Sequence, residues 1–463
     1  MITAMKIGLL PLYVKLYDDK LPEMRERTEK FYSDIAGRFE QCGMEVIRAP
    51  FCRLKEEFCK AVGDFEKGGA KAIVTLHIAY SPSLESVEAL CGTKLPVVVL
   101  DTTQTLEFTN RQNPDEIMYC HGIHGVMDMC SMLTRRGKEY AIAAGHFSES
   151  DCIERVCGYV RAAAAASSLK NAKVGLIGGV FEGMGDFQVP YSELNERFGI
   201  EVEPQSPEYI RALSDGITAA QIEAEIERSR ELYEFSDGII REEYVESVRS
   251  CLALRKIIKE RKLSAFSVNF SGIGRENSGL STMPFAECCL AMSRGTGYAG
   301  EGDVLTAAFV GALLHGWAET TFVEIFCPDW KNNMVFLSHM GEVNYRIADT
   351  KPKITRVGVN YSPGGFPYVG YTRMKGGAGV YVNVSRGRKG YKLLAASAEM
   401  IGYDDDNFDG SMRGWMQTEK SCAEFLEALS ENGATHHSAF VYGANTDELR
   451  YFGRLLGLET VVI

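Results

Sequence analysis

The sequence has no C-x-x-C pair among its 13 cysteines, which excludes the usual spacing of zinc-binding and thioredoxin-like sites. Because the cysteines are odd in number and scattered, we expect reduced thiols and a cytoplasmic location. Positive charge is also scarce, since 50 lysines and arginines face 62 aspartates and glutamates, for a formal net charge of −12. A nucleic-acid-binding protein needs a basic face toward the phosphates, so we expect no nucleic acid among the partners.

Long apolar runs are absent as well. No uncharged apolar run approaches the ~20 residues of a membrane span, so we expect no membrane partner. Met1 to Leu12 lacks the basic start, long apolar stretch and small-residue cleavage site of a secretory signal, which again predicts a cytoplasmic protein. What remains is typical of a globular protein, with 45% hydrophobic residues over 463 positions, long enough for about two to four domains.

The first part of the chain alternates between short apolar segments and helical segments. Ala72 to Leu76 and Pro96 to Leu100 are continuous apolar runs of the kind found in parallel sheets covered on both faces, and a helical segment from Ser83 to Leu90 separates them. This alternation predicts a doubly wound α/β domain, whose ligands lie beyond the carboxyl ends of the strands. The pattern restarts at Ala172 to Gly178, so we place a domain boundary near residue 170.

The pattern changes from about residue 325 onward. Short alternating segments, such as Met334 to Met340 and Gly379 to Val384, are broken there by glycine and proline turns. This arrangement predicts antiparallel β-structure, either a barrel or a sandwich.

Two glutamates in this second half, Glu324 and Glu342, lie in apolar, strand-like segments. Burying an unpaired carboxylate is costly, so each is expected to have a basic partner, a metal or a catalytic role. A salt bridge is the more common reason for a glutamate in a strand, and both readings stay open. The adjacent His436 and His437 follow in a segment of small residues; on an extended chain they point in opposite directions, so one at most faces a given site.

Two carboxylates and one imidazole suit a divalent cation such as Mn²⁺, Mg²⁺ or Co²⁺ with open coordination positions. Such a cation polarises a carbonyl, and a nearby carboxylate can then move a proton between neighbouring carbons through an enediol. Candidate ligand-binding residues also occur at strand ends, where His77 and His146 follow apolar runs, and in the segment from His121 to His124. For each of these histidines a structural role is the more common explanation, and both interpretations stay open.

In chain order, several segments resemble the L-arabinose isomerase family within the wider arabinose/fucose isomerase group. They are AGEGD at Ala299 to Asp303, TTFVEI at Thr320 to Ile325, LSHMGEV at Leu337 to Val343 and GATHHSA at Gly433 to Ala439. Upstream, HGIHG at His121 to Gly125 and GMGDF at Gly183 to Phe187 resemble further family segments. The order of segments is shared over nearly the full chain.

The resemblance implies an aldose–ketose isomerase acting on a pentose, a hexose or a close derivative. Glu324 and Glu342 match the two carboxylates that bind the metal and act as acid and base, and His437 matches the C-terminal metal ligand. We expect Mn²⁺ as the cofactor, with Mg²⁺ or Co²⁺ as alternatives. The residues expected to contact the sugar are His77, His124, Asp186 and His436.

The resemblance also implies two Rossmann-like α/β domains, at residues 1–170 and 171–325, followed by a C-terminal antiparallel β-barrel domain at 326–463. It further implies a homo-oligomer, a trimer or a hexamer, with active sites between subunits, where His124 would reach a neighbour's pocket.

One feature separates this chain from the arabinose isomerases, which carry another histidine ligand shortly after the second glutamate. The corresponding stretch here, Arg356 to Gly365, has no histidine. Fucose isomerases use two carboxylates and one histidine, so the sugar stays open. The alternative is a non-catalytic sugar-binding or sensor protein on the same scaffold. A nucleotide-dependent enzyme using the glycine-rich segment Gly175 to Asp186 is a third hypothesis, although that segment lacks the Gly-x-Gly-x-x-Gly order.

Overall fold

The computed structural model describes residues 5–358 and 362–463, and the chain divides into two compact units between Ser167 and Ser168. The N-terminal unit contains a five-stranded parallel sheet in the order β2-β1-β3-β4-β5. Its strands are β1 (Met5–Leu12), β2 (Met44–Arg48), β3 (Ala72–His77), β4 (Val97–Asp101) and β5 (Tyr140–Ala144). Its helices are α1 (Lys15–Lys20), α2 (Met24–Gln41), α3 (Lys55–Gly68), α4 (Ser83–Gly92), α5 (Ile117–Cys120), α6 (Ile123–Arg135) and α7 (Cys152–Leu169), with a 3-10 turn at Pro114–Glu116.

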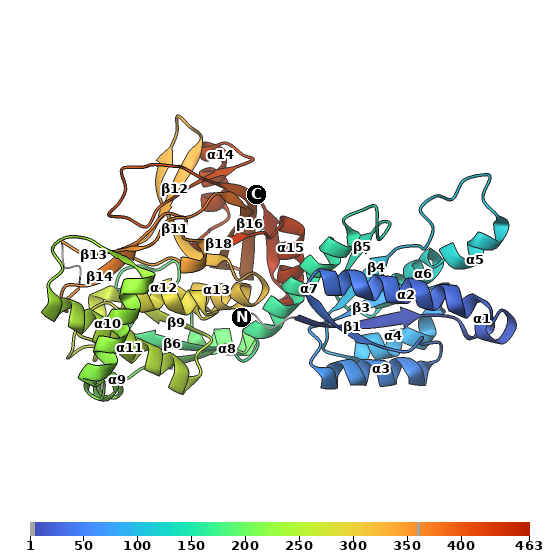
Figure 1. The fold of residues 1–463 in the computed structure, drawn as a ribbon, viewed down its shortest axis with the longest axis horizontal. Coiled ribbons are helices and arrows are strands. Elements are labelled where there is room, and N and C mark those ends of the chain that lie inside the picture. The colour runs from blue at the N-terminus through green and yellow to red at the C-terminus, as the bar shows by residue number, and fades with distance from the viewer. Residues whose placement is uncertain (1–4, 359–361) are drawn as a thin grey trace. The chain divides into compact units, whose positions relative to one another are not determined.

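Burial explains why these segments form a sheet covered on both faces. Every residue of β3 is buried, and so are the three valines and the leucine of β4. Helices α3, α4 and α6 share one hydrophobic core with the sheet, whose members include Phe58, Val87 and Met129. Figure 1 shows α2 on the other side of this sheet from α3 and α4. The strand order reverses between β1 and β3, so the carboxyl ends of these strands flank the crevice where such sheets bind ligands.

The second unit begins with a four-stranded parallel sheet in the order β10-β9-β6-β7. Its strands are β6 (Lys173–Ile177), β7 (Glu201–Pro204), β9 (Ala265–Val268) and β10 (Gly297–Gly300). The accompanying helices are α8 (Tyr191–Phe198), α9 (Pro207–Asp215), α10 (Ala219–Leu232), α11 (Arg241–Arg261), α12 (Phe285–Ser293) and α13 (Val304–Gly316), with 3-10 turns at Phe270–Gly272 and Tyr345–Ile347. A small sheet joins β8 (Glu234–Phe235), β13 (Lys353–Arg356) and β14 (Tyr368–Tyr371).

The C-terminal part of this unit is a closed barrel of six antiparallel strands. Their order is β15-β18-β11-β12-β17-β16, and β16 pairs back to β15. The strands are β11 (Thr320–Asp329), β12 (Met334–Ser338), β15 (Gly377–Gly387), β16 (Gly390–Ile401), β17 (Gly414–Thr418) and β18 (His437–Tyr442). Beside them lie α14 (Cys422–Glu431), α15 (Thr446–Leu455) and β19 (Glu459–Val462), which pairs in parallel with β16.

Helix α13 joins the parallel sheet to the barrel. All of its residues except His315 are buried. It packs on β10 and β9 of the sheet and also on β11, β18 and β15 of the barrel, and Figure 1 shows it between these two layers. A helix that is covered all round has to be apolar all round, as this sequence is. The first turn of α13 therefore lies where the carboxyl edge of the sheet meets the barrel.

These observations confirm the predicted fold class, with parallel α/β sheets followed by an antiparallel β-barrel. The division into three domains at residues 170 and 325 stays a prediction; β11 begins at Thr320, so this barrel strand spans the second predicted boundary. Among the helices that the structure describes, none is both long enough and apolar enough to cross a membrane.

Candidate active site

The candidate site lies at the first turn of α13, where three segments of the second unit converge. Glu301 directly follows β10 at the carboxyl edge of the parallel sheet. Glu324 lies on β11 and is the register partner of His437, the first residue of β18. Because directly opposed residues of an antiparallel pair lie close together, the barrel itself brings this glutamate and this histidine to one place.

His437 is held by Asp303, the residue that caps α13. Both side chains are fully buried, and Nδ1 of His437 lies 3.1 Å from Oδ2 of Asp303. The other carboxylate oxygen of Asp303 accepts a hydrogen bond from the backbone N–H of Thr306, at 2.8 Å, as helix-capping residues do. A histidine that donates through Nδ1 to a carboxylate presents Nε2 as a free acceptor, the usual arrangement of a metal-binding histidine.

Glu324, His339 and His437 form a group whose ligand atoms all lie within 4.8 Å of one another. His339 and His437 are buried and Glu324 is half-buried. A second group with the same property consists of Glu301, His436 and His437. His437 belongs to both groups, so its Nε2 is the centre of the candidate site.

Glu342 belongs to neither group, although it is their close neighbour. Its side chain is buried, and its Oε2 lies 2.6 Å from Nδ1 of His339 and 2.9 Å from the backbone N–H of Gly341. Its Oε1 accepts a hydrogen bond from the hydroxyl of Tyr298. Burial alone would lower the pKa of His339, but the charge and hydrogen bond of Glu342, together with the charges of Glu324 and Glu301, outweigh burial and raise it. The two predicted carboxylates are therefore connected through His339.

Asp186 and His436, both predicted to contact the sugar, form an ion pair at the rim of the site. Nδ1 of His436 lies 2.6 Å from Oδ2 of Asp186, which also accepts a hydrogen bond from the His436 backbone N–H. Burial alone would lower the pKa of His436, but Asp186 and Glu301 raise it to about 10. Burial alone would raise the pKa of Asp186, but the hydrogen bonds from His436 lower it to about 2. At neutral pH His436 is therefore an imidazolium, which is a hydrogen-bond donor and not a metal ligand.

The other two predicted sugar contacts, His77 and His124, lie in the N-terminal unit. His77 ends β3 at the ligand-binding edge of the sheet, is buried, and has no hydrogen-bond partner for either ring nitrogen within the described chain. His124 is exposed, and its ring packs edge-on against His121 with centroids 5.8 Å apart. Nε2 of His121 lies 2.8 Å from the hydroxyl of Tyr17.

Three residues of the site, Glu301, Asp303 and His339, were not among those predicted. Glu301 has a backbone φ of 68°, a left-handed conformation that is uncommon outside glycine and that recurs at functional sites. The segment from Ala299 to Asp303 was recognised as a family resemblance without a role for its acids. His339 lies in a resembling segment too, but on a strand a histidine has no spacing that distinguishes a ligand from a core residue.

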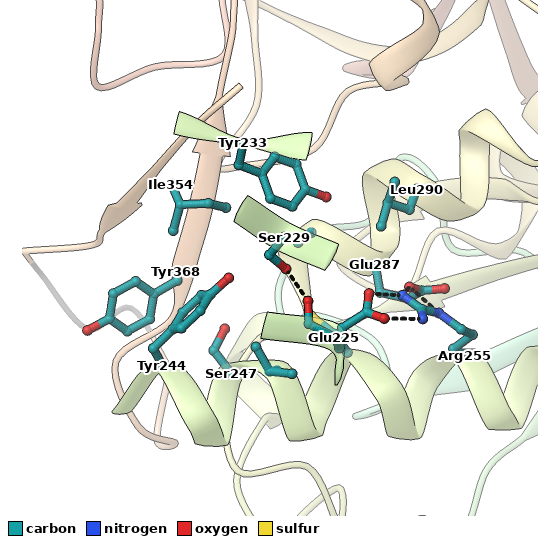
Figure 2. Close-up of a pocket in the computed structure, with 13 residues that line it drawn as sticks. Glu225, Ser229, Tyr233, Tyr244, Ser247, Arg255, Glu287, Leu290, Ile354 and Tyr368 are labelled. Atoms are coloured by element: carbon teal, nitrogen blue, oxygen red, sulfur yellow. Dashed lines mark hydrogen bonds and ion pairs between the residues drawn. The ribbon is translucent and has the colours of Figure 1, made fainter. Parts of the chain in front are cut away.

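A separate cavity lies beneath α11 and α12, and Figure 2 shows Arg255 beside Glu225 and Glu287 at one end of it. Three tyrosines, Tyr233, Tyr244 and Tyr368, line the other side. Its volume is about 20 Å³, which suffices for about one water molecule and excludes a sugar. The ion pairs of Arg255 with Glu225 and Glu287 stabilise the fold there.

Two family models match the second unit. The model described as the L-arabinose isomerase central domain matches residues 191–315, and the model described as the L-arabinose isomerase C-terminal domain matches residues 319–459. Together they cover more than half of the chain, and every carboxylate of the candidate site except Asp186 lies inside them.

Curated relatives extend the match to the N-terminal unit. The L-arabinose isomerase of Geobacillus kaustophilus is 26% identical over 416 residues, which are 84% of this chain and 80% of that protein. The L-arabinose isomerase of Shewanella baltica is 25% identical over 470 residues, covering 96% of this chain and 91% of that protein. Among solved structures, one match is an ABC transporter solute-binding protein from Agrobacterium vitis, bound with alpha-D-tagatopyranose. The alignment covers 67% of this chain and 89% of that protein at 13% identity, and its TM-score of 0.17 is too low to support any inference.

Proposed function

Because the chain belongs to the L-arabinose isomerase family and is an aldose–ketose isomerase, we propose that it acts with a divalent metal on a pentose, a hexose or a close derivative. In this proposal the reaction proceeds through an enediol, with Glu324 and Glu342 as acid and base. The observation that supports it most strongly is the state of His437. Its Nδ1 is fixed by Asp303, while its buried Nε2 has no hydrogen-bond partner among the described residues.

The residues fit a divalent cation. Oε2 of Glu301 is buried and also lacks a hydrogen-bond partner within the described chain, and it lies 3.8 Å from Nε2 of His437. Two unpartnered acceptors that face each other in a buried site are costly unless a cation lies near both. The residues proposed to hold it are Glu324, Glu342 and His437, together with Glu301, which supplies the unpartnered oxygen, and with His339 beside them. Oxygen and imidazole ligands suit Mn²⁺, with Mg²⁺ and Co²⁺ as alternatives.

When bound, the cation supplies Lewis-acid polarisation of the sugar carbonyl and of the neighbouring hydroxyl oxygen. The protein then has to move two protons. One carboxylate takes the proton from the carbon beside the carbonyl and returns it to the neighbouring carbon, and the other carries the proton between the two oxygens. Glu324, which is half-buried, is accessible to a sugar, and Glu342 is fixed by Tyr298 and Gly341, so its orientation is set before the substrate arrives.

We propose that the charged pair of Asp186 and His436 orients the sugar. Nε2 of His436 is buried without a hydrogen-bond partner in the described chain, and its imidazolium N–H can donate to a sugar hydroxyl. This donor lies 3.8 Å from Oε2 of Glu301 and therefore at the edge of the proposed metal position. His77 and His124 are retained as proposed sugar contacts, and His124 is proposed to act in a homo-oligomer.

The test is isomerisation of a panel of aldoses and ketoses, including L-arabinose and L-fucose, by purified protein with EDTA and with added Mn²⁺. We expect metal-dependent conversion of at least one sugar. The variants E324Q and E342Q should each lose turnover by about 100-fold or more while keeping the fold. A matched control is E319Q, which removes a carboxylate whose side chain is 42% exposed and pairs with Lys375, and which should leave turnover unchanged.

If Mn²⁺ and a sugar both bind but no sugar in the panel is converted, the non-catalytic sugar-binding alternative is favoured. If Mn²⁺ does not bind the wild-type protein at all, the proposed metal site is wrong.

A further inference from the structure

An open groove of about 700 Å³ lies in the second unit, and none of its lining residues belongs to the Glu–His site. Its walls are helix α8, the turn between β15 and β16 with the start of β16, and the segment from Gly457 to the start of β19. The turn is tight, because Gly387 and Gly390 are register partners and leave only Arg388 and Lys389 at its tip. These two cationic side chains therefore project from neighbouring positions of a short, well-defined turn.

The groove carries an excess of positive charge. Four cationic side chains line it, Arg197, Arg388, Lys389 and Lys392, against two carboxylates, Glu193 and Glu459. Both carboxylates are already paired. Glu459 lies 3.6 Å from Nζ of Lys392, and Glu193 lies 2.9 Å from the guanidinium of Arg386, which lies on β15 just before the turn. The groove is therefore locally positive, whereas the chain as a whole has a formal net charge of −12.

Three of these cations have no carboxylate partner among the residues that the structure describes. Arg197 donates to the backbone carbonyl of Gly457, at 2.5 Å. The side chains of Arg388 and Lys389 make no hydrogen bond or ion pair with any residue that the structure describes, and both residues are exposed. Like charges gathered at one groove repel one another unless an anion lies between them.

The groove also contains a buried tyrosine hydroxyl. Tyr391 lines it and is only 5% exposed. Glu193 and Arg386 lie near its hydroxyl, but the hydroxyl makes no well-formed hydrogen bond within the described chain. Burial, reinforced by the charge of Glu193, raises the pKa of Tyr391 to about 12, so the hydroxyl keeps its proton at neutral pH. A buried hydroxyl that lacks a good partner is costly, a cost that an acceptor on a bound ligand would remove.

We propose that this groove binds a small phosphorylated ligand, with the phosphate between Arg197, Arg388 and Lys389 and hydrogen-bonded to the Tyr391 hydroxyl. Arginine and lysine together with a neutral hydroxyl donor are the groups that recognise a phosphate dianion. The groove is larger than an inorganic phosphate ion needs and falls within the ~300–1,000 Å³ of small-molecule sites, which points to an ester with an organic body. The proposal is independent of the isomerase assignment, because the two sites share no residue.

The test is equilibrium binding to the full chain by calorimetry, with glucose 6-phosphate and inorganic phosphate as the phosphate probes and glucose as the uncharged probe. We expect saturable binding of the ester at one site per chain, weaker binding of inorganic phosphate, and none of glucose at the groove. The double variant R388Q/K389Q should bind the ester about tenfold or more weakly, and Y391F severalfold more weakly. The matched control R135Q/R136Q removes two adjacent exposed cations of α6 and its end and should bind like the wild type.

Equal binding of inorganic phosphate and the ester would support the phosphate site and identify the free ion as its ligand. Binding that is the same in the wild type, R388Q/K389Q and the control, or no binding of either phosphate probe, would overturn the proposal. Because R388Q/K389Q changes only an exposed turn, its circular dichroism should match the wild type, and Y391F tests the same site from a buried position.

Discussion

Nδ1 of His339 lies 2.6 Å from Oε2 of Glu342, and both side chains are buried. The contact places the imidazole between Glu342 and the group formed with Glu324 and His437. His339 is therefore either a ligand itself or the residue that holds Glu342 in position, and the two roles separate experimentally.

In the variant H339Q we expect Mn²⁺ affinity to fall by about 10- to 100-fold, because either role fixes the geometry of the site. The role is read from kcat at saturating Mn²⁺. If His339 is only a ligand, saturating Mn²⁺ should restore kcat of H339Q to near the wild-type value. If His339 positions Glu342, kcat should stay low, since Glu342 loses its imidazole partner. If Mn²⁺ affinity in H339Q equals that of the wild type, His339 takes no part in the site.

Asp303 connects helix capping to the candidate ligand His437. In D303N we expect helix α13 to stay capped, since asparagine is as good a capping residue as aspartate, and the thermal midpoint should change little. Mn²⁺ affinity should nevertheless fall about tenfold or more, because the carboxylate that orients His437 loses its charge. D303A, which removes both functions, should also lose about 1 kcal/mol of stability. Unchanged Mn²⁺ affinity in D303N would contradict the role assigned to Asp303.

Gly300 is packed against His339 so closely that a Cβ atom there would lie 2.8 Å from Cε1 of the imidazole. In G300A the ring has to shift, and we expect a loss of about 1–3 kcal/mol of stability together with weaker Mn²⁺ binding. The control is G37A in α2, where a Cβ meets nothing within 4 Å and the change should be neutral or stabilising by about 0.5–1 kcal/mol. Urea unfolding of both variants makes the comparison, and similar results for the two would contradict this account.

Arg255 compensates two carboxylates inside the second unit. It donates to Glu287, whose side chain is fully buried, at 2.7 Å, and to Glu225, which is 13% exposed, at 2.7 Å. Burial raises the pKa of Glu287 despite its two arginine partners, so the site tolerates no loss of positive charge. In R255M we expect about 3 kcal/mol of destabilisation in urea unfolding, because Arg294 alone remains for Glu287. R230M, which breaks a pair exposed by 62% and 64%, should change stability by less than about 1 kcal/mol.

Asp18 makes the N-terminal unit sensitive to acid. Burial alone would raise the pKa of Asp18, but hydrogen bonds from Arg25 and Arg53, each 2.5 Å, hold the pKa below its usual value. A carboxylate whose pKa is lower when folded contributes stability above its unfolded pKa of about 3.9 and loses that contribution as the pH falls through the folded value.

The free energy of unfolding of the wild type should therefore exceed that of D18N by a constant amount between about pH 5 and 7, and the difference should shrink below about pH 4. D19N is the control, since Asp19 forms only an exposed pair with Lys15. A difference between wild type and D18N that stays constant down to the acid transition would show that the arginines do not act through the charge of Asp18.

The sequence predicted the elements whose signals are local. Apolar runs located β3 and β4, and the helical segment between them became α4, because burial and helical periodicity act within a few residues. Strand β8 has no such signal, because it pairs with β13, and a partner so distant in sequence leaves no local pattern.

The candidate site divides in the same way. Sequence alone indicates Glu324 and Glu342, because a carboxylate in an apolar segment needs a basic partner, a metal or a catalytic role to offset its burial. The family resemblance adds His437. The proximity of Glu324 and His437 depends on a strand register, and the contact of His339 with Glu342 depends on the turn after β12, neither of which any spacing reveals.

The sequence by itself determined the α/β and antiparallel character of the two parts, the family and the residue types available for metal chemistry, since periodicity and composition carry that information. The alternating pattern alone left a barrel and a sandwich open, the family resemblance implied a barrel, and the pairing of β15 with β16 that closes the strand order confirms it. The tertiary structure alone brought Glu301, Asp303 and His437 together and left Arg388 and Lys389 without partners among the residues it describes, because contacts between distant segments are set by how α13 and the barrel pack and not by any local pattern.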